Sequence, residues 1–284
     1  MSGAPETKRV GKMVKIGVFK MGAIGTALLV ELLLDERADR EDISVRVVTT
    51  GAKMQEEEAS AVEKLKEFDP DMVIVVSPNA ALPGPKAARE AFEGKPVIVI
   101  SDAPAKKAKE EFEEKGYGYI LVNADSMIGA RREFLDPTEM ALFNSDVIRV
   151  LAGTGAFRAI QKAIDGVIDA IKEGKQPELP KLVLTAEKAV ENGGFSNPYA
   201  RAKAYAAYTI AEKVADLNVK GCFMIKEPEK YIPVVAAAHE MMRIAGKLAD
   251  EAREIEKGLD SLYRTPHSRK GEVLEKTKLM DKPS

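Results

Sequence analysis

The chain has 284 residues, of which 45% are hydrophobic and 31% are charged, and its formal net charge is -2 at pH 7. This length allows one large domain or two modest ones, and the near-neutral charge gives no reason to expect nucleic acid or an anionic membrane as a partner. The lone cysteine, Cys222, excludes an intrachain disulfide and is typical of the reducing cytoplasm. No apolar run approaches the roughly 18–20 residues of a membrane span, so we expect a cytoplasmic protein.

The chain divides by composition into three expected parts. Residues 1–12 are polar and lack the apolar core of a secretory signal, so we expect a disordered tail, native or added, before a fold that starts at Met13. Residues 13–135 have the pattern of an α/β domain. Residues 136–284 have the pattern of a helical bundle with a small β segment and a C-terminal tail.

Apolar, β-branched runs alternate with polar, helix-forming segments in the first half of the chain. The apolar runs span residues 14–19, 44–49, 72–76, 96–100 and 118–122, and the helical segments span 27–35, 56–68, 85–92 and 104–115. Strands that are apolar throughout indicate a parallel sheet whose two faces are both covered by helices. We therefore predict a Rossmann-like α/β fold for this half.

The second half is mainly helical. A helix is predicted to start at Asp136, which can cap it. Pro137 follows in the first turn, and Glu139 supplies an acid three residues after the cap. Asn197 opens a later helix to about residue 217, and Pro233 opens the longest, to about residue 257. Residues 181–184 and 221–225 could pair as a small satellite sheet.

The two later helices are rich in alanine, as at residues 204–208 and 234–238. Alanine favours helix and permits close approach of helix axes. A sheet that is already covered on both faces cannot bury these helices. We expect them to pack on each other or on a second copy of the chain.

Residues 20–26 (KMGAIGT) form a glycine turn between the first predicted strand and the first predicted helix. Such turns present backbone N–H groups to anionic ligands. The dinucleotide fingerprint needs a third glycine and an acid at the end of the second strand, and here that strand ends in Thr49-Thr50-Gly51. The turn therefore lacks the acid that binds the adenosine ribose of NAD, and a cofactor without adenosine is the natural alternative. Its expected cofactor-binding residues are Lys20, Gly22, Ala23, Gly25 and Thr26.

Polar or turn-forming residues also follow the other strands, and the carboxyl ends of parallel strands lie along one edge of a sheet. Ser77, Pro78 and Asn79 begin a rigid, proline-punctuated loop that is either a ligand site or an ordinary strand–helix connection. Gly129 and Arg131 precede the second half. Arg131, with the arginine that follows it, could clamp an anionic tail or form a surface charge pair.

Other kinds of site are poorly supported. His239 and His267 stand far apart in the sequence and belong to no cluster with metal-ligand spacing, so we expect no metal. Cys222 lies in an apolar run and is interpreted as a packing residue. The chain has no nucleophile elbow and no Walker phosphate loop.

Seven stretches of the chain resemble the coenzyme F420-dependent methylenetetrahydromethanopterin dehydrogenase family of methanogenic and related archaea. They are residues 20–26 (KMGAIGT), 33–42 (LLDERADRED), 83–85 (PGP), 101–104 (SDAP), 129–137 (GARREFLDP), 238–243 (AHEMMR) and 264–267 (RTPH). The resemblance runs from about Met13 to the C-terminus. It implies an α/β unit with a helical bundle, assembled as a homohexamer built of dimers.

The resemblance further implies reversible hydride transfer between the methylene carbon of a tetrahydromethanopterin, the one-carbon carrier, and the deazaflavin ring of coenzyme F420, with no metal. Oxidation leaves a methenyl cation on the pterin, which a nearby carboxylate would stabilise. The candidates are Asp102 and Asp125 at strand ends and Glu240 in the helical half, although helix capping alone would also explain Asp102. The alternative function is a non-catalytic ligand-binding or sensing module with the same sheet.

Overall fold

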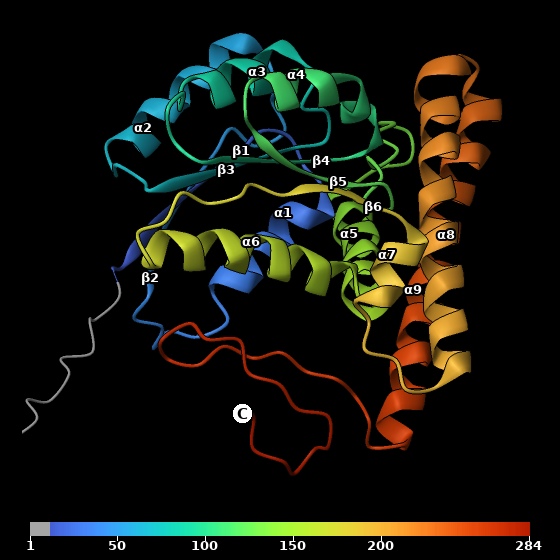
Figure 1. Ribbon diagram of the computed structural model, residues 1–284. Helices are drawn as coiled ribbons and strands as arrows, with labels where there is room; N and C mark the ends of the chain where they lie inside the picture. The colour runs from blue at the N-terminus through green and yellow to red at the C-terminus, as the bar shows by residue number, and fades with distance from the viewer. Residues whose placement is uncertain (1–11) are drawn as a thin grey trace, which may run out of the picture.

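The computed structural model describes residues 12–284 and is built around a six-stranded parallel sheet, with strand order β2-β1-β3-β4-β5-β6 (Figure 1). The strands are β1 (Val14–Lys20), β2 (Ile43–Thr49), β3 (Met72–Ser77), β4 (Val97–Ser101), β5 (Gly118–Val122) and β6 (Lys181–Leu184). Every residue of β3, β4 and β5 is buried, as expected of a sheet covered on both faces. The five predicted strands and the α/β class are confirmed.

Helices cover the two faces of the sheet in separate layers (Figure 1). One layer contains η1 (Glu56–Ala61), α2 (Val62–Lys66), α3 (Pro83–Glu90), η2 (Ala103–Ala108) and α4 (Lys109–Glu114). The other contains α1 (Gly25–Leu34), α5 (Pro137–Thr154) and α6 (Ala156–Lys172). Alternate strand residues supply the two cores: Ile74 packs in the α1 layer, and Val75 packs in the α2–α4 layer.

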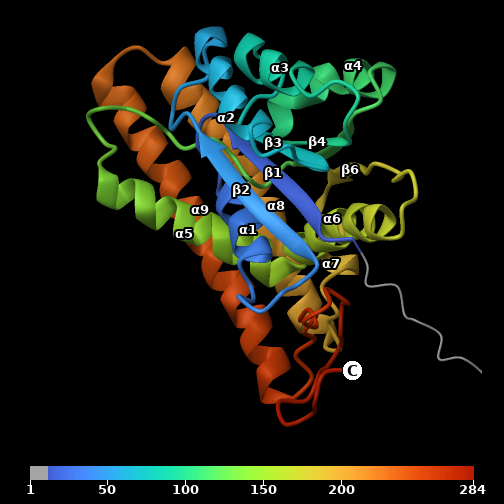
Figure 2. The same ribbon diagram turned by 90° about the vertical axis from the view of Figure 1, so that its left-hand side faces the viewer.

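A helical hairpin stands beside the β6 end of the sheet (Figures 1 and 2). It consists of α8 (Pro198–Val219), the π-helix η3 (Lys220–Met224) and α9 (Pro228–Gly258), and the short α7 (Ala186–Glu191) precedes it. Many of its alanines are buried, and α8 and α9 contact each other along their length, which confirms that the helices pack on each other. The predicted start of α9 was wrong, because Pro228 occupies the first turn and Pro233 lies inside the helix. None of the helices in residues 12–284 is both long and apolar enough to cross a membrane.

The predicted satellite sheet is wrong. β6 pairs in parallel with β5, in a register that places Lys181 opposite Tyr119, and so completes the main sheet. Residues 221–225 do not form a strand, because α8 continues into η3 at this point. Elements from both sides of residue 135 share the core of the α1 layer, and the division into domains at that point stays a prediction.

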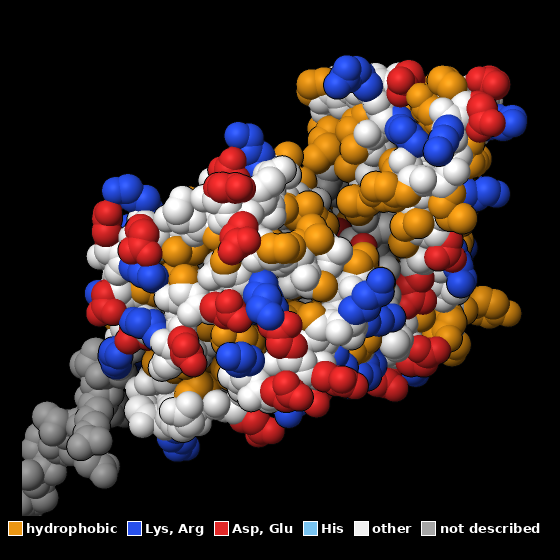
Figure 3. Space-filling model, turned by 90° about the horizontal axis from the view of Figure 1, so that it is seen from above, with side chains coloured by type: hydrophobic (Ala, Val, Ile, Leu, Met, Phe, Trp, Pro, Cys, Tyr) orange, Lys and Arg blue, Asp and Glu red, His pale blue; other side chains and the backbone are white. Residues whose placement is uncertain are grey.

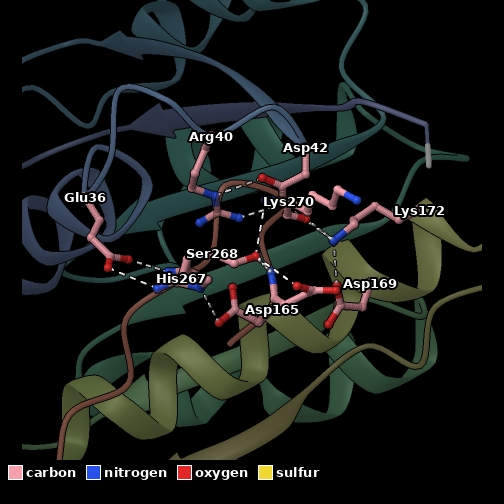
Figure 4. A network of polar contacts seen from close by, with 10 residues as sticks. Glu36, Arg40, Asp42, Asp165, Asp169, Lys172, His267, Ser268 and Lys270 are labelled. Atoms are coloured by element: carbon pink, nitrogen blue, oxygen red, sulfur yellow. Dashed lines mark hydrogen bonds and ion pairs between the residues drawn. The ribbon is translucent and has the colours of Figure 1, made fainter. Parts of the chain in front are cut away.

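The C-terminal segment, residues 259–284, runs back beneath α1 and α6 (Figures 1 and 2). Its main anchor is His267, which is fully buried between two carboxylates (Figure 4). Its Nε2 lies 2.9 Å from Asp165 Oδ2, and its Nδ1 contacts the carboxylate of Glu36. Burial lowers the pKa of His267, but the two carboxylates outweigh this effect and raise it. The expectation of a disordered tail concerns residues 1–12 and, except for Lys12, lies outside the described residues.

Candidate active site at the carboxyl edge of the sheet

All six strands point the same way, so their carboxyl ends share one edge of the sheet. The end of the hairpin that carries η3 projects past this edge. From above, the molecule shows a hollow between its main body and the projecting lobe on the right, with hydrophobic side chains gathered around it (Figure 3). Ligands of open α/β sheets bind outside the carboxyl ends of the strands, which makes this hollow the candidate site.

The glycine turn lies at this edge and is packed tightly against its neighbours. Gly22 has φ +82°, and a Cβ at this position would lie 2.7 Å from both Met54 Sδ and Pro78 Cδ. Its N–H donates to Gly51 O over 2.9 Å. Glycine is therefore required here both for conformation and for space. The turn thus holds together the ends of three neighbouring strands, β1, β2 and β3.

Asp125 occupies the start of α1, where an anionic ligand was expected. Its Oδ1 accepts the N–H of Gly25 over 2.8 Å, and its Oδ2 accepts the N–H of Thr26 over 2.6 Å. These two donors are therefore not free for a phosphate. The part of the turn left for a ligand is half-buried Ala23, beside Lys20 at the end of β1.

Gly25 faces the interior rather than the hollow. A Cβ on Gly25 would lie 2.6 Å from Val147 Cγ1 of α5. The close approach of α5 by itself explains the glycine at this position, and ligand contact at Gly25 stays a prediction.

Asp102 lies at the end of β4 and is 2% exposed. Its Oδ1 accepts the N–H of Ala103 over 2.5 Å, so the predicted cap of the following helix is present. Burial, together with the negative charge of Asp125, raises the pKa of Asp102 well above its usual value. Burial also raises the pKa of Asp125, while the hydroxyl of Thr26 and the N–H groups of Thr26 and Gly25 act in the opposite direction. The structure therefore brings two of the three predicted carboxylates together.

Two buried hydroxyls, those of Ser77 and Ser126, lie at the end of β3 and beside Asp125. Neither has a hydrogen-bond partner within the described chain. Ser101 holds the Ser77–Asn79 loop in place, since its hydroxyl donates to Ser77 O over 2.7 Å and accepts the N–H of Ala80. Buried polar groups are normally paired, so unpaired hydroxyls mark positions for a ligand or water.

Gly129 and Arg131 both contact the helical hairpin. A Cβ on Gly129 would lie 2.5 Å from Val235 Cγ1 of α9. Arg131 donates to Gly221 O and Ile225 O, each over 3.0 Å, and its guanidinium lies 4.1 Å from the centroid of the Tyr231 ring. Carbonyl oxygens of η3 and its cap accept from this guanidinium, and the anion clamp stays a prediction.

Glu240 does not belong to the carboxylate cluster. It is exposed on α9 and pairs with Arg243 over 3.2 Å. The inward-facing residue of the AHEMMR stretch is its neighbour His239, which packs against Phe134, with 4.8 Å between ring centroids, and bonds to Glu139 over 2.7 Å. Two of the stretches that carry the family resemblance are thus in contact with each other. Burial lowers the pKa of His239.

Sequence reasoning missed the polar residues that α8 contributes to this edge. Asn218 Nδ2 donates to Met127 O over 2.7 Å and so holds the loop after β5 against the hairpin. Glu212 lies 3.4 Å from Asn123 Nδ2, and burial raises the pKa of Glu212. The sequence could have indicated that Asn218 is buried, because it continues the helical spacing of three buried alanines, Ala204, Ala207 and Ala211.

The fold and this edge define an α/β protein with a candidate ligand site beside a parallel sheet. A family model described as methylene-5,6,7,8-tetrahydromethanopterin dehydrogenase matches residues 14–284, and the chain belongs to this family.

Named relatives are similar over nearly their whole length. The F420-dependent methylenetetrahydromethanopterin dehydrogenase of Archaeoglobus fulgidus is 78% identical, covering 95% of this chain and 99% of that protein. The enzyme of the same name from Methanocaldococcus jannaschii is 60% identical over the same shares. A solved structure of an F420-dependent methylene-tetrahydromethanopterin dehydrogenase, in complex with methylene-tetrahydromethanopterin and coenzyme F420, is 50% identical and covers 96% of this chain and all of that one, with a TM-score of 0.93.

Proposed function

We propose that this protein catalyses reversible hydride transfer between methylenetetrahydromethanopterin and coenzyme F420, as a one-carbon step of methanogenesis or its reverse. The observation that carries the proposal is the likeness in sequence and fold to the solved structure that contains both ligands. The enzyme need form no covalent bond with either substrate. Its task is to hold the two ring systems in contact and keep water from them.

The hollow at the carboxyl edge is the proposed place for both rings. Lys20, Ala23 and the Ser77–Asn79 loop are the proposed cofactor contacts, because they border this edge and their polar groups are not all used within the protein. Packing and hydrogen bonds at five other predicted residues support the site: Gly22, Gly25, Thr26, Gly129 and Arg131. The absence of an acid after β2 agrees with a cofactor that lacks adenosine.

We further propose a cytoplasmic homo-oligomer, with the homohexamer implied by the family resemblance. Exposed apolar residues support a partner surface of this kind. They include Leu28 and Leu32 on one face of α1, and Leu142 on α5.

The test is turnover. Purified protein mixed with methylenetetrahydromethanopterin and coenzyme F420 should bleach the deazaflavin absorption band, and NAD or NADP in place of coenzyme F420 should give no reaction. A pure binding module would leave the band intact while still showing saturable binding by calorimetry. Comparable turnover with a nicotinamide cofactor would contradict the proposed specificity.

A further inference from the structure

Asp102 and Asp125 form a buried carboxyl pair without a balancing cation. Asp102 is 2% exposed and Asp125 is fully buried. Neither carboxyl forms an ion pair anywhere in residues 12–284, and their hydrogen bonds are to backbone N–H groups. Burial and the charge of Asp125 raise the pKa of Asp102, against a smaller opposing effect of Lys106, and two buried carboxyls near each other resist being ionised together.

The backbone decides which carboxyl is ionised. Asp125 accepts one N–H group on each oxygen, and both groups belong to the start of α1, where the helix dipole favours a negative charge. Asp102 accepts an N–H on Oδ1 from the short 3-10 helix η2, and the N–H of Met127 also favours its charged form. Asp125 has the Thr26 hydroxyl in addition to its two N–H groups, so it is the better-supported anion and Asp102 is the favoured place for a proton.

Reduction of a deazaflavin consumes a hydride and a proton. A protonated Asp102 at this edge could donate that proton. We propose that Asp102 is the acid that supplies the proton when the deazaflavin is reduced, an inference that rests on the proposed function. The methylene C–H bond breaks and its electron pair moves with hydrogen to the deazaflavin ring carbon. The O–H bond of Asp102 breaks and its proton goes to the pyrimidine nitrogen of the same ring.

This step balances charge as well as atoms. The pterin gains one positive charge, Asp102 gains one negative charge, and the reduced deazaflavin receives hydride and proton together. The carboxylate then lies near the new cation and stabilises it, and solvent returns the proton after product release.

The protonation state can be measured without substrates. Infrared spectra of the ligand-free protein at neutral pH should show the carbonyl stretch of a protonated carboxylic acid, and Asp102→Asn should remove it. In Asp125→Asn the negative charge beside Asp102 is gone, so Asp102 should lose its proton, and its infrared band, at a lower pH than in the wild type. Asp136→Asn is the matched control, since Asp136 caps α5 through the N–H of Glu139 but is exposed. A band that survives in Asp102→Asn would overturn the proposal.

Kinetics test the role itself. For the wild type, deazaflavin reduction should slow as the pH rises and the reverse reaction should slow as it falls. Asp102→Asn should lower kcat for reduction about a hundredfold or more, flatten this pH profile and leave both dissociation constants within about threefold. Asp102→Glu should restore part of the rate. Unchanged kcat, or a wild-type reduction rate that rises with pH, would contradict the proposal. A wild type that is inactive with coenzyme F420 would instead refute the proposed function, while the infrared result would still report on the proton.

Discussion

The contact between Gly25 and Val147 shows how one residue can set the position of a helix. The first turn of α1 is bound by Asp125 at its N–H groups and touches α5 at the Cα of Gly25. Both contacts join residues about a hundred positions apart in the chain. The close approach leaves no room for a side chain, because protein interiors are packed at nearly the density of organic crystals.

We expect Gly25→Ala to destabilise the protein by about 1–3 kcal/mol, because the added Cβ would lie 2.6 Å from Val147 Cγ1. Urea unfolding measures the effect. The control is Gly166→Ala in α6, where a Cβ has open space and should stabilise the helix by up to about 1 kcal/mol. Equal stability of the wild type and Gly25→Ala would show that α5 can shift to make room for the added Cβ at no cost in free energy.

At the scale of elements, the π-helix η3 gives the hairpin its shape near the hollow. Its backbone carries Phe223 and Met224, which are 67% and 71% exposed. Arg131 holds this turn from the loop after β5, and Val235 fills the space left by Gly129 and Gly221. π-Helical turns occur often at functional sites, and this one lies on the projecting end of the hairpin.

Arg131→Lys should loosen η3, because a lysine lacks the separate Nε and Nη2 donors that bond Gly221 O and Ile225 O, and lacks the planar group that stacks on the Tyr231 ring. Hydrogen exchange followed by mass spectrometry should show faster exchange in residues 220–225, by about tenfold, with the sheet unaffected. Arg132→Lys is the control, since Arg132 is exposed. Protection that stays at wild-type level in Arg131→Lys would show that Val235 packing alone maintains the turn.

Across the whole molecule, a network of charged residues holds the C-terminal segment to the rest of the fold (Figure 4). His267 joins this segment to Glu36 after α1 and to Asp165 of α6. Arg37 also donates to the carbonyl oxygen of His267 over 3.1 Å, and buried Arg40 pairs with Asp42 over 2.8 Å. The raised pKa of His267 makes this anchor dependent on pH.

A histidine whose pKa is raised on folding stabilises the native state fully below its unfolded pKa of about 6.5, and this contribution is lost as the pH rises through the folded value. His267→Gln should therefore destabilise the protein most at pH 6, on the order of 3 kcal/mol, and less at pH 9. Thermal melts of both proteins across this range measure the difference. A loss that is independent of pH would show that His267 acts through packing.

His239 provides the opposite control. Burial lowers its pKa, so its neutral form is favoured in the native state and its contribution is lost as the pH falls below about 6.5. His239→Gln should therefore reduce the melting temperature more at pH 9 than at pH 5. The two variants should show opposite trends with pH.

The sequence by itself determined the first five strands, the edge at which their carboxyl ends meet, and the family. These depend on local patterns: apolar runs make buried strands, turn residues follow them, and parallel pairing brings the strand ends to one edge. Stretches such as GARREFLDP and AHEMMR carry the family resemblance without any knowledge of the fold. Capping of α5 by Asp136 and of η2 by Asp102 was also predictable, because a cap involves residues adjacent in the chain.

The tertiary structure alone decided what each polar group at that edge contacts. Asp125 binds the start of α1, Arg131 binds η3, and β6 joins the main sheet, each across a long stretch of intervening chain. Glu240 and His239 are neighbours in sequence, yet one faces solvent and the other is buried. Local patterns do not determine such pairings, because a hydrogen bond or a packing contact depends on which distant backbone the fold brings within a few ångströms.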